Sequence, residues 1–226
     1  MSEKPTSART EVLAVPTRTH DAPRGGWPGG GEAPYEINTT FYEATGQTFA
    51  GADAYHLERF LCSQTIVMSL EGIPAFYIHS MLATPNDHAQ VERRGMNRAI
   101  NRHRWDYPSL NALLDDPRSV QARVLEALSH RLRVRAKQPA FHPNATQFTM
   151  PLDNAVFGVW RQSLDRHQSI FALHNVSNQP MAVSHMSMNL IDDETWVDLL
   201  TGEEIDMMQE AISLAPYQCR WITNRG

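Results

Sequence analysis

A basic stretch with an adjoining tryptophan is the densest group of chemically active side chains in the sequence. Its members are Arg93, Arg94, Arg98, Arg102, His103, Arg104 and Trp105. A guanidinium group is a rigid fork of N–H donors that suits phosphate oxygens, carboxylates or adjacent hydroxyls. The stretch therefore predicts a phosphate site, a nucleic-acid surface, or a loop that folds over a binding pocket.

Other polar residues stand close to this stretch. Asn86 and Asp87 precede it, and both types bond their own backbone in turns, so the pair indicates either a turn or a pocket rim. His79 ends a short apolar run, where a lone histidine is a hydrogen-bonded structural residue or a ligand. The 10 histidines show no HExxH or other ligand spacing, so the sequence predicts no catalytic metal.

Composition narrows the class of protein. The chain has 226 residues, a net charge of -5 and 42% hydrophobic residues, which is enough for a core. The acidic balance argues against a general nucleic-acid binder. Cys62 and Cys219 lie far apart and predict two buried thiols rather than a disulfide or zinc site. Without a signal-like or membrane-spanning run in the sequence, we expect a cytoplasmic protein.

The elements that must position these residues fall into three segments. Residues 1–34 are rich in Pro, Gly, Thr and Arg and predict a disordered leader. Residues 35–139 predict a helix over 52–72, a buried strand over 73–79, a long polar connection over 80–108 and an amphipathic helix over 117–136. Residues 140–226 predict an antiparallel sheet domain, because turn residues separate short strands. We place these strands at 147–150, 156–160, 169–173, 181–183, 196–200 and 218–222.

A strand whose following loop carries polar residues is the active-site unit of a (β/α)8 barrel. One such unit cannot close a barrel. The predicted fold is therefore α/β plus all-β, with an incomplete C-terminal end of a barrel followed by a small antiparallel sheet domain.

Several motifs occur in order along residues 34–226. They are PYEIN at 34–38, FY at 41–42, GIPAFYIHS at 72–80, ND at 86–87, NRAINR at 97–102 and LAPY at 214–217. Together they resemble the C-terminal portion of the sucrose phosphorylase and glucosylglycerate phosphorylase group of the alpha-amylase superfamily.

The resemblance implies a retaining transfer of glucose from a sucrose-like or glucosylglycerate-like donor. A carboxylate nucleophile forms a glucosyl intermediate, a second carboxylic acid protonates the leaving group, and phosphate releases glucose 1-phosphate. Phosphate is then a co-substrate, and no cofactor is implied. The family's nucleophile and acid would both lie before residue 1, so we expect a truncated or frame-shifted product that is inactive alone.

The same resemblance suggests roles for particular residues. Arg98 would reach the glucosyl pocket and hydrogen-bond sugar hydroxyls. Tyr35 and Glu36 would belong to the acceptor-site loop, or else be an ordinary loop tyrosine and a solvated glutamate. Asn86 and Asp87 would lie on the pocket rim.

His20 and Asp21 match the family's His-Asp motif, whose carboxylate braces the transition state. Asp21 would then be a catalytic residue and His20 a substrate-binding one. Their distance in sequence from Tyr35 is shorter than the family's, so a chance dipeptide in the leader is the alternative.

Two other functions remain open. The sheet domain could bind carbohydrate without catalysis, or pack on a separately encoded barrel half. Residues 93–104 could bind nucleic acid. Because an apolar strand at 73–79 would lack neighbours, we also expect the isolated chain to aggregate or form a homo-oligomer.

Overall fold

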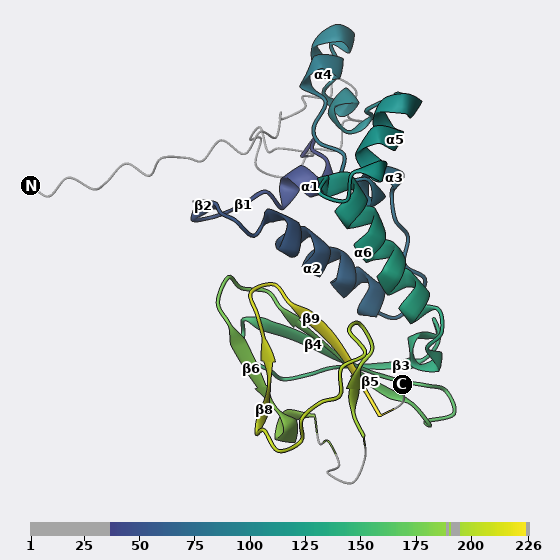
Figure 1. Cartoon of the computed structure of the whole chain (residues 1–226), viewed down its shortest axis with the longest axis vertical. Coiled ribbons are helices and arrows are strands. Elements are labelled where there is room, and N and C mark those ends of the chain that lie inside the picture. Colours follow the sequence, from purple (N-terminus) through teal and green to yellow (C-terminus); the bar gives the residue numbers. More distant parts are fainter. Residues whose placement is uncertain (1–36, 189, 191–194, 225–226) are drawn as a thin grey trace, which may run out of the picture.

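The protein has a helical end and a sheet end (Figure 1). The structure is a computed structural model, and it describes residues 37–188, 190 and 195–224. The leader predicted at 1–34 lies outside these residues.

Two long helices form the centre of the helical part. Helix α2 (His56–Ser69) packs against α6 (Val120–Arg135), and Ser119 caps α6 by accepting a hydrogen bond from Ala122 N at 3.0 Å. Both helices were predicted from their apolar periodicity, within four residues at each end. The shorter helical segments are α1 (Phe41–Ala44), α3 (Ile78–Met81), α4 (His88–Arg94), η1 (Asn97–Asn101), α5 (Tyr107–Asp115), η2 (Pro139–Phe141) and η3 (His185–Ser187).

The buried strand predicted at 73–79 is wrong. Residues 73–77 have no regular structure, and α3 begins at Ile78. Ile73 is 82% exposed and Ile78 is 58% exposed. Among the described residues no strand pairs with this segment, so its backbone has no sheet to join. Within 35–139, where part of a barrel was expected, the described residues form helices, loops and one short hairpin.

The sheet end matches the predicted antiparallel class. A five-stranded sheet has the order β3 (Thr146–Thr149), β4 (Val156–Gln162), β5 (Ser169–Asn175), β9 (Cys219–Thr223), β7 (Val197–Asp198), with every neighbouring pair antiparallel. Strands β6 (Met181–Ser184) and β8 (Ala211–Leu214) form a second pair, and β1 (Gln47–Thr48) and β2 (Gly51–Ala52) a short hairpin.

One hydrophobic cluster joins the two ends of the molecule. It combines Phe60 and Leu128 from the helices with Val159, Ile170 and Trp221 from one face of the large sheet. A second cluster fills the space between that sheet's other face and the β6–β8 pair. The helices are therefore packed directly on the sheet through a hydrophobic core to which both contribute residues. Among the helices of the described residues, none has the length and apolar character needed to cross a bilayer.

Candidate functional site

Asn86 brings two distant motifs together. Its Oδ1 accepts a hydrogen bond from Thr40 N at 2.7 Å, and its side chain also contacts the Thr39 hydroxyl, with Nδ2 to Oγ1 at 3.2 Å. Thr40 in turn caps α1 by accepting from Glu43 N. The residues that directly follow the PYEIN motif are thus fixed to the loop after α3. The Asn86 side chain thus has a positioning role between two segments that are distant in sequence.

Asp87 organises the next segment. Its Oδ1 accepts from Gln90 N at 2.8 Å at the start of α4, and its Oδ2 contacts His103 Nδ1 at 2.7 Å. Burial raises the pKa of Asp87, but the hydrogen bonds from His103 and Gln90 N outweigh it, and the pKa is lowered overall. Asp87 therefore stays ionised and ties the beginning of α4 to the end of the basic stretch.

A second small network lies beside this pair. Thr84 Oγ1 accepts from Trp105 Nε1 at 3.1 Å and contacts His79 Nδ1 at 3.1 Å. The His103 ring packs edge-on against Trp105 at 4.6 Å between centroids. Burial, followed by the charge of His103, lowers the pKa of His79, which favours its neutral form. His79 is thus a hydrogen-bonded residue of the loop framework.

Arg98 lies on η1, close to these networks. Ala99 and Ile100 are buried and anchor this 3₁₀ segment, and Ile100 O accepts from Asp87 N at 2.8 Å. Arg98 itself is exposed. Residues i and i+3 of a 3₁₀ helix share one face, so Arg98 lies on the same face as Asn101.

Asn101 lines a cavity, which we call the helical-end cavity. Its volume is about 360 Å³. The other lining residues come from the start of α1 and the segment before it, from α2, and from the segment that leads into α3. They are Thr39, Thr40, Phe41, Gln64, Val67, Ala75, Phe76, Tyr77, His79 and Ser80. Three motif regions, at 39–41, 75–80 and 101, therefore meet around one space. The lining is mainly apolar with several hydroxyl and amide groups, which suits a neutral polar ligand.

Two arginines, Arg135 from α6 and Arg161 from β4, hold the C-terminal end of α2 in place. At the C-terminal end of α2, Arg135 Nε donates to Met68 O at 2.7 Å, and Arg161 Nη1 donates to Ser69 O at 3.1 Å. Arg135 Nη2 also donates to Gly72 O at 3.1 Å. Cations at a helix C-terminus satisfy carbonyls that lack partners within the helix. These bonds fix the backbone between Met68 and Gly72, from which the chain continues to Ala75 in the cavity wall.

Of the predicted site residues, the structure describes Arg98, Asn86 and Asp87, and the bond from Asp87 N to Ile100 O ties Asp87 to the 3₁₀ segment that carries Arg98. Tyr35, Glu36, His20 and Asp21 lie outside the described residues. Sequence reasoning did not single out Thr84, His103 as a partner of Asp87, or Gln64. Gln64 is a buried polar residue on α2, and a polar residue within the apolar pattern of that helix was its signal.

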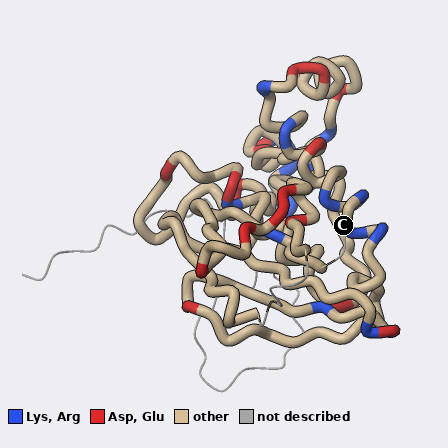
Figure 2. Tube along the Cα trace, turned by 60° about the horizontal axis from the view of Figure 1, so that its bottom comes forward, with Lys and Arg blue, Asp and Glu red and all other residues tan. Residues whose placement is uncertain are grey.

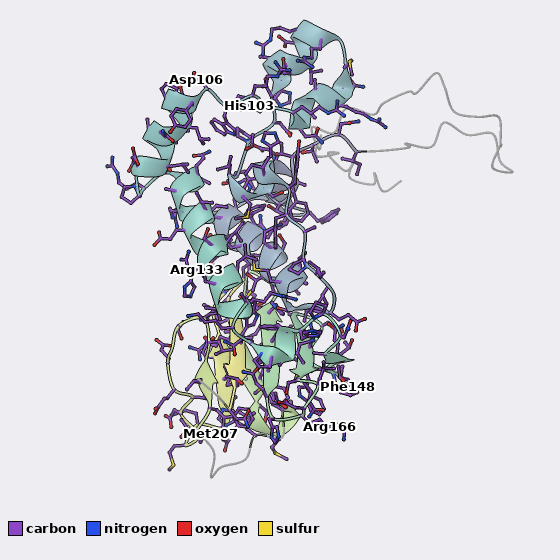
Figure 3. The ribbon with its side chains drawn as sticks, turned by 90° about the vertical axis from the view of Figure 1, so that its right-hand side faces the viewer. His103, Asp106, Arg133, Phe148, Arg166 and Met207 are labelled. Atoms are coloured by element: carbon purple, nitrogen blue, oxygen red, sulfur yellow. The ribbon has the colours of Figure 1, made fainter. Side chains whose placement is uncertain are left out.

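In the described part of the chain, no group of three or more His, Cys, Asp or Glu side chains is arranged to hold a metal ion. Figure 2 shows Lys and Arg interspersed with Asp and Glu along the trace. His103 and Asp106 both lie toward the helical end, remote from Met207 and Arg166 (Figure 3).

Comparison with known proteins finds sugar phosphorylases among the sequence relatives of the chain. The chain is 37% identical over 193 residues to a glucosylglycerate phosphorylase of Allomeiothermus silvanus, covering 85% of this chain and 32% of that protein. The Escherichia coli glucosylglycerate phosphorylase is 31% identical, covering 86% and 33%. A sucrose phosphorylase of Agrobacterium vitis is 28% identical over 108 residues, covering 48% and 19%. The chain thus spans about a third of the length of the glucosylglycerate phosphorylases it matches.

Solved structures show the same fold. A structure of AmyP in complex with maltose matches with a TM-score of 0.63 at 17% identity, covering 76% of this chain and 35% of that one. An Anoxybacillus alpha-amylase matches with a TM-score of 0.54 at 14% identity, covering 74% and 32%. No protein-family model matches the chain. Through its sequence relatives, the chain belongs to the glucosylglycerate and sucrose phosphorylase group.

Proposed function

We propose that the chain forms the C-terminal part of an alpha-glucoside phosphorylase that transfers glucose, with retention, from a glucosylglycerate-like or sucrose-like donor to phosphate. Glucosylglycerate is the favoured donor class. The glucosylglycerate phosphorylases match 85–86% of the chain at 31–37% identity, whereas the Agrobacterium vitis sucrose phosphorylase matches 48% at 28%. Phosphate is the co-substrate, and the reaction needs no cofactor.

The observation that carries this proposal is the meeting of motif regions at the helical-end cavity. Asn86 joins the segment after Tyr35 and Glu36 to the loop that leads to Arg98. Arg98, which shares one face of η1 with Asn101, would bind adjacent sugar hydroxyls through its N–H donors, while Tyr35 and Glu36 would contribute the acceptor side. Asp87 and His103 hold this rim in place.

The 226 residues supply only part of the chemistry. The family's nucleophile and acid correspond to positions before residue 1. Removing both groups abolishes the two chemical steps rather than slowing them. Asp21 and His20 remain candidates for the transition-state carboxylate and its neighbour. The polypeptide alone therefore binds one side of the sugar and does not turn it over.

A chimera tests the role of Arg98. The matching third of the Allomeiothermus silvanus enzyme is replaced by this chain, and glucose 1-phosphate release from glucosylglycerate is measured. Arg98→Ala should lower kcat/KM about 100-fold or more, because charge-assisted hydrogen bonds to substrate are lost. Arg102→Ala, an exposed arginine of the same stretch, is the matched control and should change kcat/KM less than about threefold. Equal effects of the two substitutions would refute the sugar-binding role.

A complementing module is a second candidate, favoured by an exposed apolar surface. Val67 and Tyr77, which line the helical-end cavity, are more than one-third exposed, and so are Ile73 and Ile78 in the same segment as Tyr77. Exposed apolar patches of this kind mark interaction surfaces. Co-purification of a stoichiometric barrel-type partner with the chain would support this candidate, and recovery of the chain alone would count against it.

Nucleic-acid binding through residues 93–104 has weaker support. Charges of both signs are mixed along the trace, and the net charge of the chain is -5. A binder of phosphate backbones concentrates positive charge on one face. No association with DNA or RNA at low salt is expected, and salt-dependent binding would reverse this ranking.

A further inference from the structure

The sheet end has a cavity of its own, which we call the sheet-end cavity. Its volume is about 440 Å³, and its walls come from β3, β4, β5 and the segments around η3 and before β7. Phe148, one of its lining residues, lies at the sheet end of the molecule, whereas His103 lies at the helical end (Figure 3). The two cavities are therefore separate sites.

A continuous row of aromatic rings forms one wall of the sheet-end cavity. The Phe148 and Trp160 ring centroids are 4.9 Å apart and their planes are tilted by only 32°. Trp160 then stacks on Phe171 at 5.9 Å, and Phe171 contacts Trp196 at 5.9 Å. Phe171 and Trp196 are buried, whereas Phe148 is 46% exposed and Trp160 partly exposed. The outer two rings thus offer an accessible apolar surface whose two planes are inclined by 32°.

Hydroxyl and amide groups accompany these rings. Ser169 Oγ accepts a hydrogen bond from Trp160 Nε1 at 3.1 Å, and a hydroxyl that accepts one bond still has a proton to donate. Thr149 lies at the exposed rim. Asn224 also lines the cavity, and its Oδ1 is buried without a hydrogen-bond partner within the described residues. A buried acceptor without a partner costs free energy that a ligand hydroxyl would recover.

Among the residues that the structure describes, none with a charged side chain lines this cavity. An ionic ligand would lose its hydration there without gaining a counter-charge. A purely apolar ligand would leave the Asn224 oxygen without a partner. The volume lies in the range of small-molecule sites. A ligand with a flat apolar face and a rim of hydroxyls matches both the apolar ring surface and the polar groups.

We propose that the sheet-end cavity binds a neutral pyranose sugar, with one ring stacked on Phe148 and Trp160 and its hydroxyls bonded to Ser169 and Asn224. This site is additional to the glucosyl site proposed at the helical end. It would hold a carbohydrate chain or a second sugar on the protein without catalysing its conversion.

Titration of the full chain with maltotriose tests the proposal, because Trp160 and Trp196 line the site and their fluorescence reports on it. We expect a saturable fluorescence change. Phe148→Ala should weaken binding about three- to tenfold, the worth of one aromatic stacking contact. Phe49→Ala is the matched control, since Phe49 is fully exposed on the β1–β2 hairpin and should leave binding unchanged. Glucitol, which has hydroxyls but no ring face, should not saturate the signal.

Asn224→Ala is a second variant, which remains informative if the sheet does not fold without the Phe148 side chain. The free protein should be no less stable, because the amide oxygen has no partner to lose, yet maltotriose binding should weaken. Absence of saturation, equal binding by Phe148→Ala and wild type, or equal binding of glucitol would each overturn the proposal. Arg98→Ala should leave maltotriose binding at the sheet-end cavity unchanged. The result of this titration therefore does not depend on whether the proposed phosphorylase function is right.

Discussion

Ser69 and His174 are joined by a hydrogen bond of 2.9 Å between Oγ and Nε2, where α2 meets the large sheet. His174 Nδ1 donates to Phe157 O at 2.9 Å, and Trp221 Nε1 donates to Ser69 Oγ at 3.0 Å. His174 is fully buried, and a carbonyl partner at Nδ1 with a hydroxyl at Nε2 suits a neutral imidazole. One histidine thus links β4, β5 and β9 to the helix that lines the helical-end cavity.

Stability should fall in mild acid because of this histidine. Burial lowers the pKa of His174 to about 4, although the bond to Phe157 O opposes the shift. The ordinary pKa is about 6.5, so unfolding takes up a proton between these two values. The contribution of His174 is complete above about pH 6.5 and decreases as pH falls, by about 2 kcal/mol between about pH 7 and about pH 4.5.

Urea unfolding of wild type and His174→Gln at these two pH values measures that effect. The glutamine does not titrate, so the variant should lack this part of the pH dependence while other groups keep theirs. The same pH dependence in both proteins would show that His174 is not a buried neutral group.

Arg161 should contribute strongly to stability although it has no carboxylate partner among the described residues. It is fully buried, burial lowers its pKa, and its guanidinium donates to Ser69 O, to His142 O at 2.9 Å and to Ala145 O at 3.3 Å. Arg161→Met would leave three carbonyls without these donors and should lower the free energy of unfolding by about 2–4 kcal/mol. Arg133→Met, at an exposed position of α6, is the control and should cost less than about 0.5 kcal/mol. A stable Arg161→Met protein would contradict this role.

Loss of Asn86 should loosen the segment around α1. Asn86→Ala removes the acceptor of Thr40 N and should lower stability by about 1 kcal/mol, with faster hydrogen exchange at the Thr40 amide. Asn154→Ala, in the exposed turn before β4, should leave that exchange rate unchanged. Unchanged exchange in Asn86→Ala would mean that the segment is held by other contacts.

The exposed apolar surface beside the helical-end cavity should make the isolated chain associate with itself. Ile78→Lys places a charge on that surface and should shift the chain toward monomer. Leu164→Lys changes an exposed leucine between β4 and β5, 64% exposed, and should not. Sedimentation velocity at several protein concentrations measures both, and equal association of the two variants would place the contact elsewhere.

Local patterns predicted most of the elements that pack on a neighbour within the chain. The periodicity of α6 and the alternation of β4 and β5 depend on faces that this chain buries itself. The pattern at 73–79 instead predicted burial on both faces, and the described residues offer no flanking strands to provide it. Strand β8 was missed although Ile212 and Leu214 alternate with Ala211 and Ser213, a pattern typical of a half-buried strand.

Within residues 80–108, which were predicted as a polar connection, local sequence signals could have predicted helix α4. Asp87 followed three residues later by Gln90 is a helix-start pattern, and Gly95, with φ of 60°, ends α4. Only the family resemblance singled out Asn86, Asp87 and Arg98 as one site, and their shared role in sugar binding stays a prediction. The contacts of Asn86 with Thr40 and of Asp87 with His103 join residues 46 and 16 positions apart, which no local pattern encodes.

We propose that this chain provides one side of a glucosyl site and requires the remainder of a barrel for turnover. The most direct test measures glucose 1-phosphate from glucosylglycerate and phosphate, first with the purified chain and then after adding the separately expressed, unmatched part of the Allomeiothermus silvanus enzyme. We predict no product from the chain alone and product from the mixture, abolished by Arg98→Ala. Turnover by the purified chain alone would contradict the account.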